Sequence, residues 1–201
     1  MYPEDPTRAQ LAENAAGLLL QGRAAALPGL RPLLLAEAAA APAPTRALDI
    51  SAETAALCEA LQRAVRRRSW LYFAPAEVPQ PAAVPRALLQ CALLCFVQGA
   101  LAADTPAVVQ LRSTPGAAVL ALRGGTGRTL PGDARALLLR LAAVCGGAVV
   151  QSGGRGPFGA ALRLPPAAKM PVREPLQADD YLLDRFSPLY TILGKSCALP
   201  G

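Results

Sequence analysis

The sequence predicts an α+β protein in which one layer of helices covers a mixed β-sheet. From residue 51 onward, helical and strand-like apolar patterns follow one another in the order α-β-α-β-β-α-β-β. Two of the strand pairs, 107–112 with 117–122 and 148–151 with 158–164, are separated by turn-forming residues and therefore predict hairpins. A hydrophobic fraction of 53% over 201 residues supplies the core that such a two-layer packing needs.

The chain begins with a predicted helical hairpin over residues 7–44. Residues 7–26 have one apolar face, and Leu27-Pro28-Gly29 is expected to end this first helix. A second helix is expected from Pro32, in its first turn, to Ala41. Two short helices cannot bury their own faces, so the hairpin should pack on the rest of the chain or on a second copy.

The predicted domain spans residues 45–166 and starts with a linker or short strand at 45–50. Ser51 is the expected N-cap of a helix that runs to about Arg68, with Glu53 in its first turn. Its expected buried stripe is Ala56, Leu57, Ala60, Leu61, Ala64 and Val65.

The next helix, 86–102, follows an aromatic strand at 70–73 and a proline-rich passage. It is hydrophobic nearly all round, which predicts that it is buried. A later helix is expected to start at a capping Asp133 and to end at Gly146-Gly147.

The C-terminal part divides into a linker at 167–175 and an amphipathic tail at 176–201. The tail carries a concentration of bulky apolar groups that must be covered, either by its own domain or by a protein partner. These groups are Tyr181, Leu182, Phe186, Leu189, Tyr190 and Leu193.

Composition excludes several function classes. The chain has no histidine, which rules out Ser-His-Asp and Cys-His catalysis and a phosphohistidine acceptor. Cys91 and Cys95 share a helix face, but without histidine or a CxxC pair we expect no metal site and interpret the five cysteines as small apolar residues. The net charge of +6 has one dense cluster, Arg66 to Arg68, and without interleaved aromatic residues we expect no nucleic-acid binding. The N-terminus does not resemble a signal peptide and no apolar run is long enough to span a membrane, so we expect a cytoplasmic protein.

The residues from Val119 to Gly127 read as a buried strand that ends in a glycine turn, Arg-Gly-Gly-Thr-Gly. Together with the helix 86–102, and with the helix that ends at Gly146-Gly147, this turn resembles the motif series of a known fold. From about Leu48 to Pro166 the chain resembles the ATP-binding catalytic domain of sensor histidine kinases, the fold shared with Hsp90 and gyrase B. The resemblance implies a two-layer α/β sandwich and a remnant nucleotide site at Gly125, Gly127 and Gly132.

The sequence departs from the family at the positions that hold the nucleotide. The family's magnesium-binding asparagine falls on Gln98, and its adenine-binding aspartate falls on Arg123. Arginine donates hydrogen bonds and accepts none, so adenine recognition is lost at that position. Only four residues separate Gly127 from Gly132, where the family keeps a long lid. We hypothesise that Arg123 blocks the site.

The resemblance therefore predicts a catalytically inactive, histidine-kinase-like regulatory or scaffold protein with no catalytic residue and no cofactor. Residues 7–41 stand where the family carries its dimerisation hairpin, which implies a homodimer. A functional module that binds ATP and magnesium, and an unrelated α/β adaptor protein, remain open as alternatives.

Overall fold

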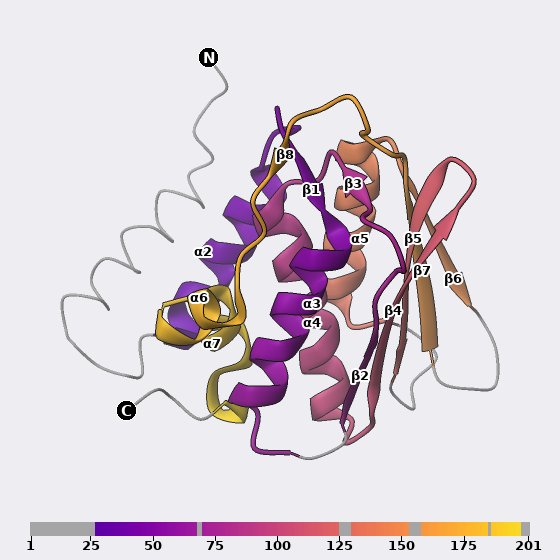
Figure 1. Cartoon of the computed structure of the whole chain (residues 1–201). Coiled ribbons are helices and arrows are strands. Elements are labelled where there is room, and N and C mark those ends of the chain that lie inside the picture. Colours follow the sequence, from indigo (N-terminus) through magenta and orange to yellow (C-terminus); the bar gives the residue numbers. More distant parts are fainter. Residues whose placement is uncertain (1–26, 68–69, 125–129, 153–157, 185, 198–201) are drawn as a thin grey trace.

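The computed structural model describes residues 27–67, 70–124, 130–152, 158–184 and 186–197. The predicted helix at 7–26 and the predicted site residues Gly125 and Gly127 lie outside these ranges. In the described part, a five-stranded sheet, a central layer of three helices and an outer group of helices follow one another across the molecule (Figure 1). The predicted mixed α/β fold class is confirmed.

The main sheet has the order β2-β4-β5-β7-β6. Strand β2 is parallel to β4, and the remaining pairs are antiparallel. Both predicted hairpins are confirmed, because β4 pairs with β5 and β6 with β7 in adjacent antiparallel register. The bounds of the strands are Leu71–Ala74 (β2), Ala107–Thr114 (β4), Ala117–Gly124 (β5), Ala148–Ser152 (β6) and Phe158–Leu164 (β7).

Three helices cover one face of this sheet: α3 (Ile50–Ala64), α4 (Arg86–Ala102) and α5 (Gly132–Cys145). Helix α4 is buried along nearly its whole length, as its apolar composition predicts. The predicted cap of α3 is wrong: the Asp49 carboxylate accepts hydrogen bonds from the amides of Ser51 and Ala52, and the Ser51 hydroxyl instead accepts from the amide of Ala76. The whole predicted stripe of α3 is buried.

The ends of α3 and α5 also differ from the prediction. Helix α3 ends at Ala64 rather than near Arg68, because Val65 takes an extended conformation and forms an isolated bridge with Cys197. Asp133 lies in the first turn of α5, but the N-cap position is Pro131. Gly146 ends α5 in the left-handed conformation, with φ of 63°, as expected for a glycine at this position.

A second, three-stranded sheet has the order β3-β1-β8. Its strands are β1 (Ala47–Asp49), β3 (Pro81–Ala82) and β8 (Val172–Arg173). Strand β8 lies inside the segment that the sequence predicts as a linker, and it pairs parallel to β1 through Ala47 and Leu48. Strand pairing therefore ties this connection to the domain.

The outer group contains α2 (Leu27–Ala40), α6 (Ala178–Leu183), α7 (Pro188–Leu193) and a short 3-10 turn (Gly194–Ser196). The predicted helix stop at Leu27-Pro28-Gly29 is wrong, since these residues form the first turn of α2. A first turn tolerates a proline because its amides have no partner within the helix. Helix α2 packs on α4, α5 and α7 of its own chain.

The tail docks on its own domain, one of the two predicted outcomes. Tyr181, Leu189 and Tyr190 are buried, so these three side chains do not form the partner surface that the sequence suggests. Leu182 is half-buried, while Phe186 and Leu183 are exposed. The large apolar side chains of α6 and α7 are needed to cover α3 and α4, which explains why the tail is so rich in them.

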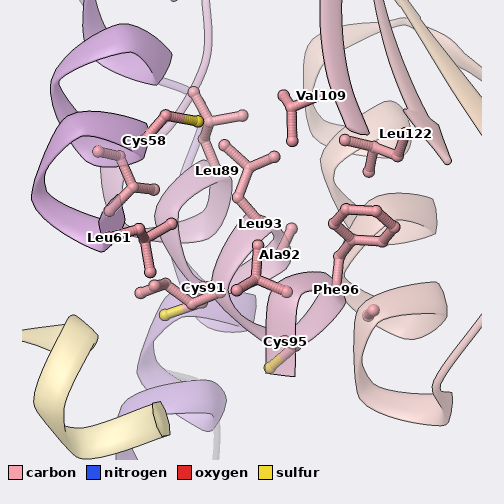
Figure 2. Close-up of a cluster of buried hydrophobic side chains, with 14 of the residues drawn as sticks. Cys58, Leu61, Leu89, Cys91, Ala92, Leu93, Cys95, Phe96, Val109 and Leu122 are labelled. Atoms are coloured by element: carbon pink, nitrogen blue, oxygen red, sulfur yellow. The ribbon is translucent and has the colours of Figure 1, made fainter. Parts of the chain in front are cut away.

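One contiguous core joins the sheet to the helices. Figure 2 shows part of it, in which side chains of α3 and α4 meet those of β4 and β5. The labelled members are Cys58, Leu61, Leu89, Cys91, Ala92, Leu93, Cys95, Phe96, Val109 and Leu122.

Candidate functional site

The resemblance implies a nucleotide site formed by helix α4 and the glycine turn after Leu122. Of its predicted residues near α4 and α5, the structure describes Gln98 and Gly132. Gln98 lies near the end of α4, and Gly132 is the first residue of α5. A side chain added at Gly132 would enter open space, which leaves this residue free of any close neighbour.

Instead, the guanidinium of Arg31 reaches into this region from α2. Its Nη2 atom lies 2.6 Å from Asp133 Oδ2 and 3.1 Å from Gln98 Oε1. The same atom lies 3.9 Å from the sulfur of Cys95. One cation therefore bridges α2, the end of α4 and the first turn of α5. Because the carboxylate of Asp133 is half exposed, solvent weakens this ion pair. The pair therefore positions the Arg31 side chain more than it adds to the free energy of unfolding.

This contact has a clear consequence for metal binding. A magnesium ion needs oxygen ligands, and the amide oxygen of Gln98 already accepts from a positively charged group. A guanidinium at hydrogen-bond distance also repels a divalent cation. Arg31 therefore places a positive charge beside the residue to which the resemblance assigns magnesium binding.

The other end of the Gln98 amide is also engaged. Its Nε2 donates to the carbonyl oxygen of Ile192 at 2.7 Å, which connects α4 to α7 of the tail. Gln98 thus holds two flanking segments, α2 and α7, against the central helix. The residue to which the resemblance assigns metal binding therefore connects helices in this structure.

Helix α4 and the start of α5 also approach closely at Gly99. A Cβ atom built on Gly99 would lie 2.1 Å from Cγ of Pro131, a distance that no side chain tolerates. Leu130, next to this proline, is buried, and so is Ala134 one turn into α5. The segment that follows the shortened lid is therefore packed directly on α4.

The predicted role of Arg123 is wrong, because its side chain lies on the opposite face of the sheet. Leu122 and Gly124 are buried toward the helices, and Arg123 between them is exposed. Successive residues of a strand alternate between the two faces. Arg123 consequently does not enter the space between α4 and α5 and does not block it.

A second polar cluster, which the sequence reasoning missed, lies at the other end of α4. Glu53 of α3 is 1% exposed, and its Oε1 accepts from Gln90 Nε2 and from the hydroxyl of Tyr181, each at 2.9 Å. Arg86 Nε lies 3.0 Å from the same oxygen, in the geometry of an ion pair rather than a directed hydrogen bond. The second carboxylate oxygen accepts from the backbone amide of Leu176.

This Glu53 cluster fixes the tail to the domain. Gln90 Nε2 also lies 2.8 Å from the Tyr181 hydroxyl, which closes the network across α3, α4 and α6. Burial and the neighbouring carboxylate of Glu53 raise the pKa of Tyr181 well above its usual value, so the hydroxyl remains a proton donor. The sequence carries a signal for this cluster: Glu53 and Gln90 both fall on otherwise apolar helix faces, where an isolated polar group must find a partner.

The cysteines behave as the composition predicts. Cys58, Cys91 and Cys95 are buried, and burial raises their pKa values to about 12, about 12 and about 11. Protonated thiols are poor metal ligands and poor nucleophiles. Across the described residues, no group of three or more Cys, Asp or Glu side chains is placed to hold a metal ion. Nor does any described helix combine the length and the apolar character that crossing a membrane requires.

Comparison with known proteins gives structural matches alone. No protein-family model and no curated protein matches the chain. Among solved structures, it is similar to the histidine kinase domain of the E. coli osmosensor EnvZ, at 14% identity and a TM-score of 0.49, over 66% of this chain and 93% of that one. It is also similar to the mycobacterial sensor histidine kinase MprB (21% identity, TM-score 0.43, over 56% of this chain and 95% of that one).

A third match is the histidine kinase domain of the blue-light activated kinase EL346 from Erythrobacter litoralis. Here the identity is 16% and the TM-score 0.44, over 81% of this chain and 93% of that one. All three are histidine kinase domains, the family that the motif series resembles.

Proposed function

We propose that this protein is a catalytically inactive, histidine-kinase-like regulatory or scaffold protein that acts in bacterial-type signal transduction through protein–protein contacts. The observation that carries the proposal is the guanidinium of Arg31 held between Gln98 and Asp133. A group of this chain occupies the oxygen that the resemblance assigns to magnesium. We place the protein, on the same proposal, in the cytoplasm.

Three further features support the same conclusion. The sequence has no histidine to accept a phosphoryl group. Arginine stands where the family's adenine-binding carboxylate falls, and it faces away from the helices. The segment after the short lid packs on Gly99 instead of standing clear of α4. The first feature removes the phosphoryl acceptor and the other two weaken nucleotide binding, so we expect that restoring one of them does not restore the activity.

The experiment that tests this is thermal unfolding of the full chain with magnesium and ATP, compared with magnesium and inorganic tripolyphosphate. A ligand at about 100 times its dissociation constant stabilises by about 2.7 kcal/mol. For a chain of this size that corresponds to a rise of roughly 5–10 °C in Tm. We expect millimolar ATP to raise Tm no more than tripolyphosphate does, because Arg123 cannot accept the hydrogen bond that the adenine amino group donates.

The working ATP-binding module is the alternative that this measurement addresses. An ATP-specific rise in Tm that requires magnesium, or transfer of labelled phosphate from ATP to the chain, would refute the proposal that the protein is catalytically inactive. An active histidine kinase domain serves as the positive control. The other alternative, an unrelated α/β adaptor protein, also predicts no ATP binding. It differs from our proposal in the protein partner, so identifying what the chain binds tests it.

A further inference from the structure

Three arginines line a cavity of about 590 Å³ at the end of α4 that is distant from Arg31. Arg86 is the first residue of α4, Arg46 directly precedes β1, and Arg173 belongs to β8. Strand β8 pairs with β1 so that Arg173 lies next to Leu48, which also lines the cavity. Segments that are far apart in the sequence thus bring three guanidinium groups to one opening.

The charges around this cavity are unbalanced. Its lining contains no aspartate or glutamate. Arg46 and Arg173 are exposed, and neither forms an ion pair or hydrogen bond through its side chain with another residue in the described ranges. Arg86 is partly neutralised by Glu53, which lies behind the cavity wall. The opening therefore presents a strongly positive potential with no internal counter-ion in its lining.

Arg86 is also held in place before any ligand arrives. Its Nε pairs with the buried carboxylate of Glu53, and its Nη2 donates to the carbonyl oxygen of Glu174. A guanidinium fixed on two sides loses little conformational entropy when it binds an anion, which favours affinity. Arginine is also the side chain best suited to phosphate, because its planar donors match the phosphate oxygens.

The N-terminus of α4 adds donors to this arginine cavity. Pro85 is the N-cap residue and provides no side-chain hydrogen bond, and the first turn has no acidic residue. Ala87 and Arg86 from this turn line the cavity. A helix N-terminus carries a partial positive charge and free amides, and therefore strengthens the attraction that the arginines produce.

Apart from Thr45 and Gln90, the remaining wall is apolar. Leu48 and Val84 are buried beside the arginines, with Pro42 and Pro44 completing this side. The volume is much larger than one phosphate group and is typical of a site for a small organic molecule. We propose that this arginine cavity binds a small organic phosphate, with the phosphate at Arg46, Arg86 and Arg173 and the organic part against the apolar wall.

This proposal is independent of the proposed function. It implies that a bound ligand would hold the segment before the tail more firmly against the domain. Strand β8 directly precedes α6, and a ligand that contacts Arg173 and Arg86 joins β8 to α4. Bound ligand should then slow amide hydrogen exchange in β8.

The test is calorimetric titration of the full chain with phenyl phosphate, inorganic phosphate and phenol as separate probes. We expect phenyl phosphate to bind at least tenfold more tightly than either fragment. The substitutions Arg46→Gln and Arg173→Gln should each weaken phenyl phosphate binding about tenfold, and both residues are exposed, so the fold should survive. The matched controls are Arg123→Gln and Arg163→Gln, two exposed arginines on the outer face of the sheet, which should change the affinity less than twofold.

Three results would overturn the proposal. They are no binding of phenyl phosphate at millimolar concentration, equal weakening by the control substitutions, and equal affinity for phenyl phosphate and inorganic phosphate. The double variant Arg46→Gln/Arg173→Gln also separates this site from the nucleotide question. If ATP with magnesium stabilised the double variant as much as the wild type, the proposal that the protein is catalytically inactive would fail. The arginine cavity would still be supported by the phenyl phosphate titration.

Discussion

At the scale of single residues, the most informative positions are those whose side chains make different contacts from the ones that the sequence predicts. The resemblance assigns Arg123 to the family's aspartate position, yet strand alternation turns its side chain away from α4. Arg31, which carries no motif, supplies the charge at Gln98 instead. What a residue can contact therefore depends on the face of the sheet or helix on which its side chain lies. The tertiary structure decides which elements cover that face.

Gly99 provides a test at this scale. Gly99→Ala places a methyl group against the ring of Pro131, so α4 and α5 must separate or one of them must shift. We expect a loss of about 1–3 kcal/mol in the free energy of unfolding, measured by urea denaturation. Gly132→Ala is the matched control, because a Cβ atom at that position meets nothing within 4 Å. Equal stability of the two variants would show that α4 and α5 do not touch at Gly99.

At the scale of elements, α4 is the centre of the protein. It contacts α2, α5, α7 and β4, and its polar residues are used to hold its neighbours rather than to bind water. Gln98 holds α2 and α7, while Gln90 and Arg86 hold α3 and the tail through Glu53. A buried carboxylate of this kind is costly to desolvate, so its partners are required for the fold to form.

The docking of the tail is tested by two leucines of its short helices. Leu189, on α7, is fully buried. Leu189→Ala should lower the free energy of unfolding by about 2–5 kcal/mol, because it removes apolar contacts and leaves a cavity. Leu183, on α6, is 82% exposed, and Leu183→Ala should change the stability by less than about 0.5 kcal/mol. Chemical denaturation of both variants measures the difference. If Leu189→Ala were as stable as Leu183→Ala, the tail would not be docked as the structure has it.

At the scale of the whole molecule, α2 is the least completely covered of the long helices. Ala38 is buried, but the leucines at 33, 34 and 35 are half-buried. Leu34 and Leu35 pack against the core of the domain, and all three leucines keep part of their apolar surface exposed. This arrangement accommodates either residues 7–26 of the same chain or a second copy, the two outcomes that the sequence leaves open.

The predicted homodimer through residues 7–41 is tested by light scattering coupled to size exclusion. The full chain should give about twice its mass of 20.7 kDa. Deleting residues 1–26 should restore the monomer, because it removes the first predicted helix and spares the α2 contacts with the domain. Deleting residues 1–44 would be a poorer experiment, since it also removes Arg31 and uncovers α4 and α7. A monomeric full chain would contradict the dimer.

Much of the fold follows from local patterns in the sequence. Helix α4 is predicted with the bounds that it has, and both hairpins are predicted with their partners, because apolar periodicity and turn residues act over short distances. The errors concern helix boundaries and short strands. Asp49 replaces Ser51 as a cap, and β8 forms within a predicted linker, because a two-residue strand exists only when a distant partner strand is present.

The sequence by itself determined the fold class, the burial of α4 and the absence of histidine, and it placed Gln98 and Arg123 at the positions to which the resemblance assigns metal and adenine binding. These are properties of residue type and local spacing. Only the tertiary structure decided that Arg31 meets Gln98, that Glu53 meets Tyr181, and that three arginines surround one cavity. The residues in these contacts are up to 128 positions apart in the chain, and their meeting depends on how helices pack, which no local pattern encodes.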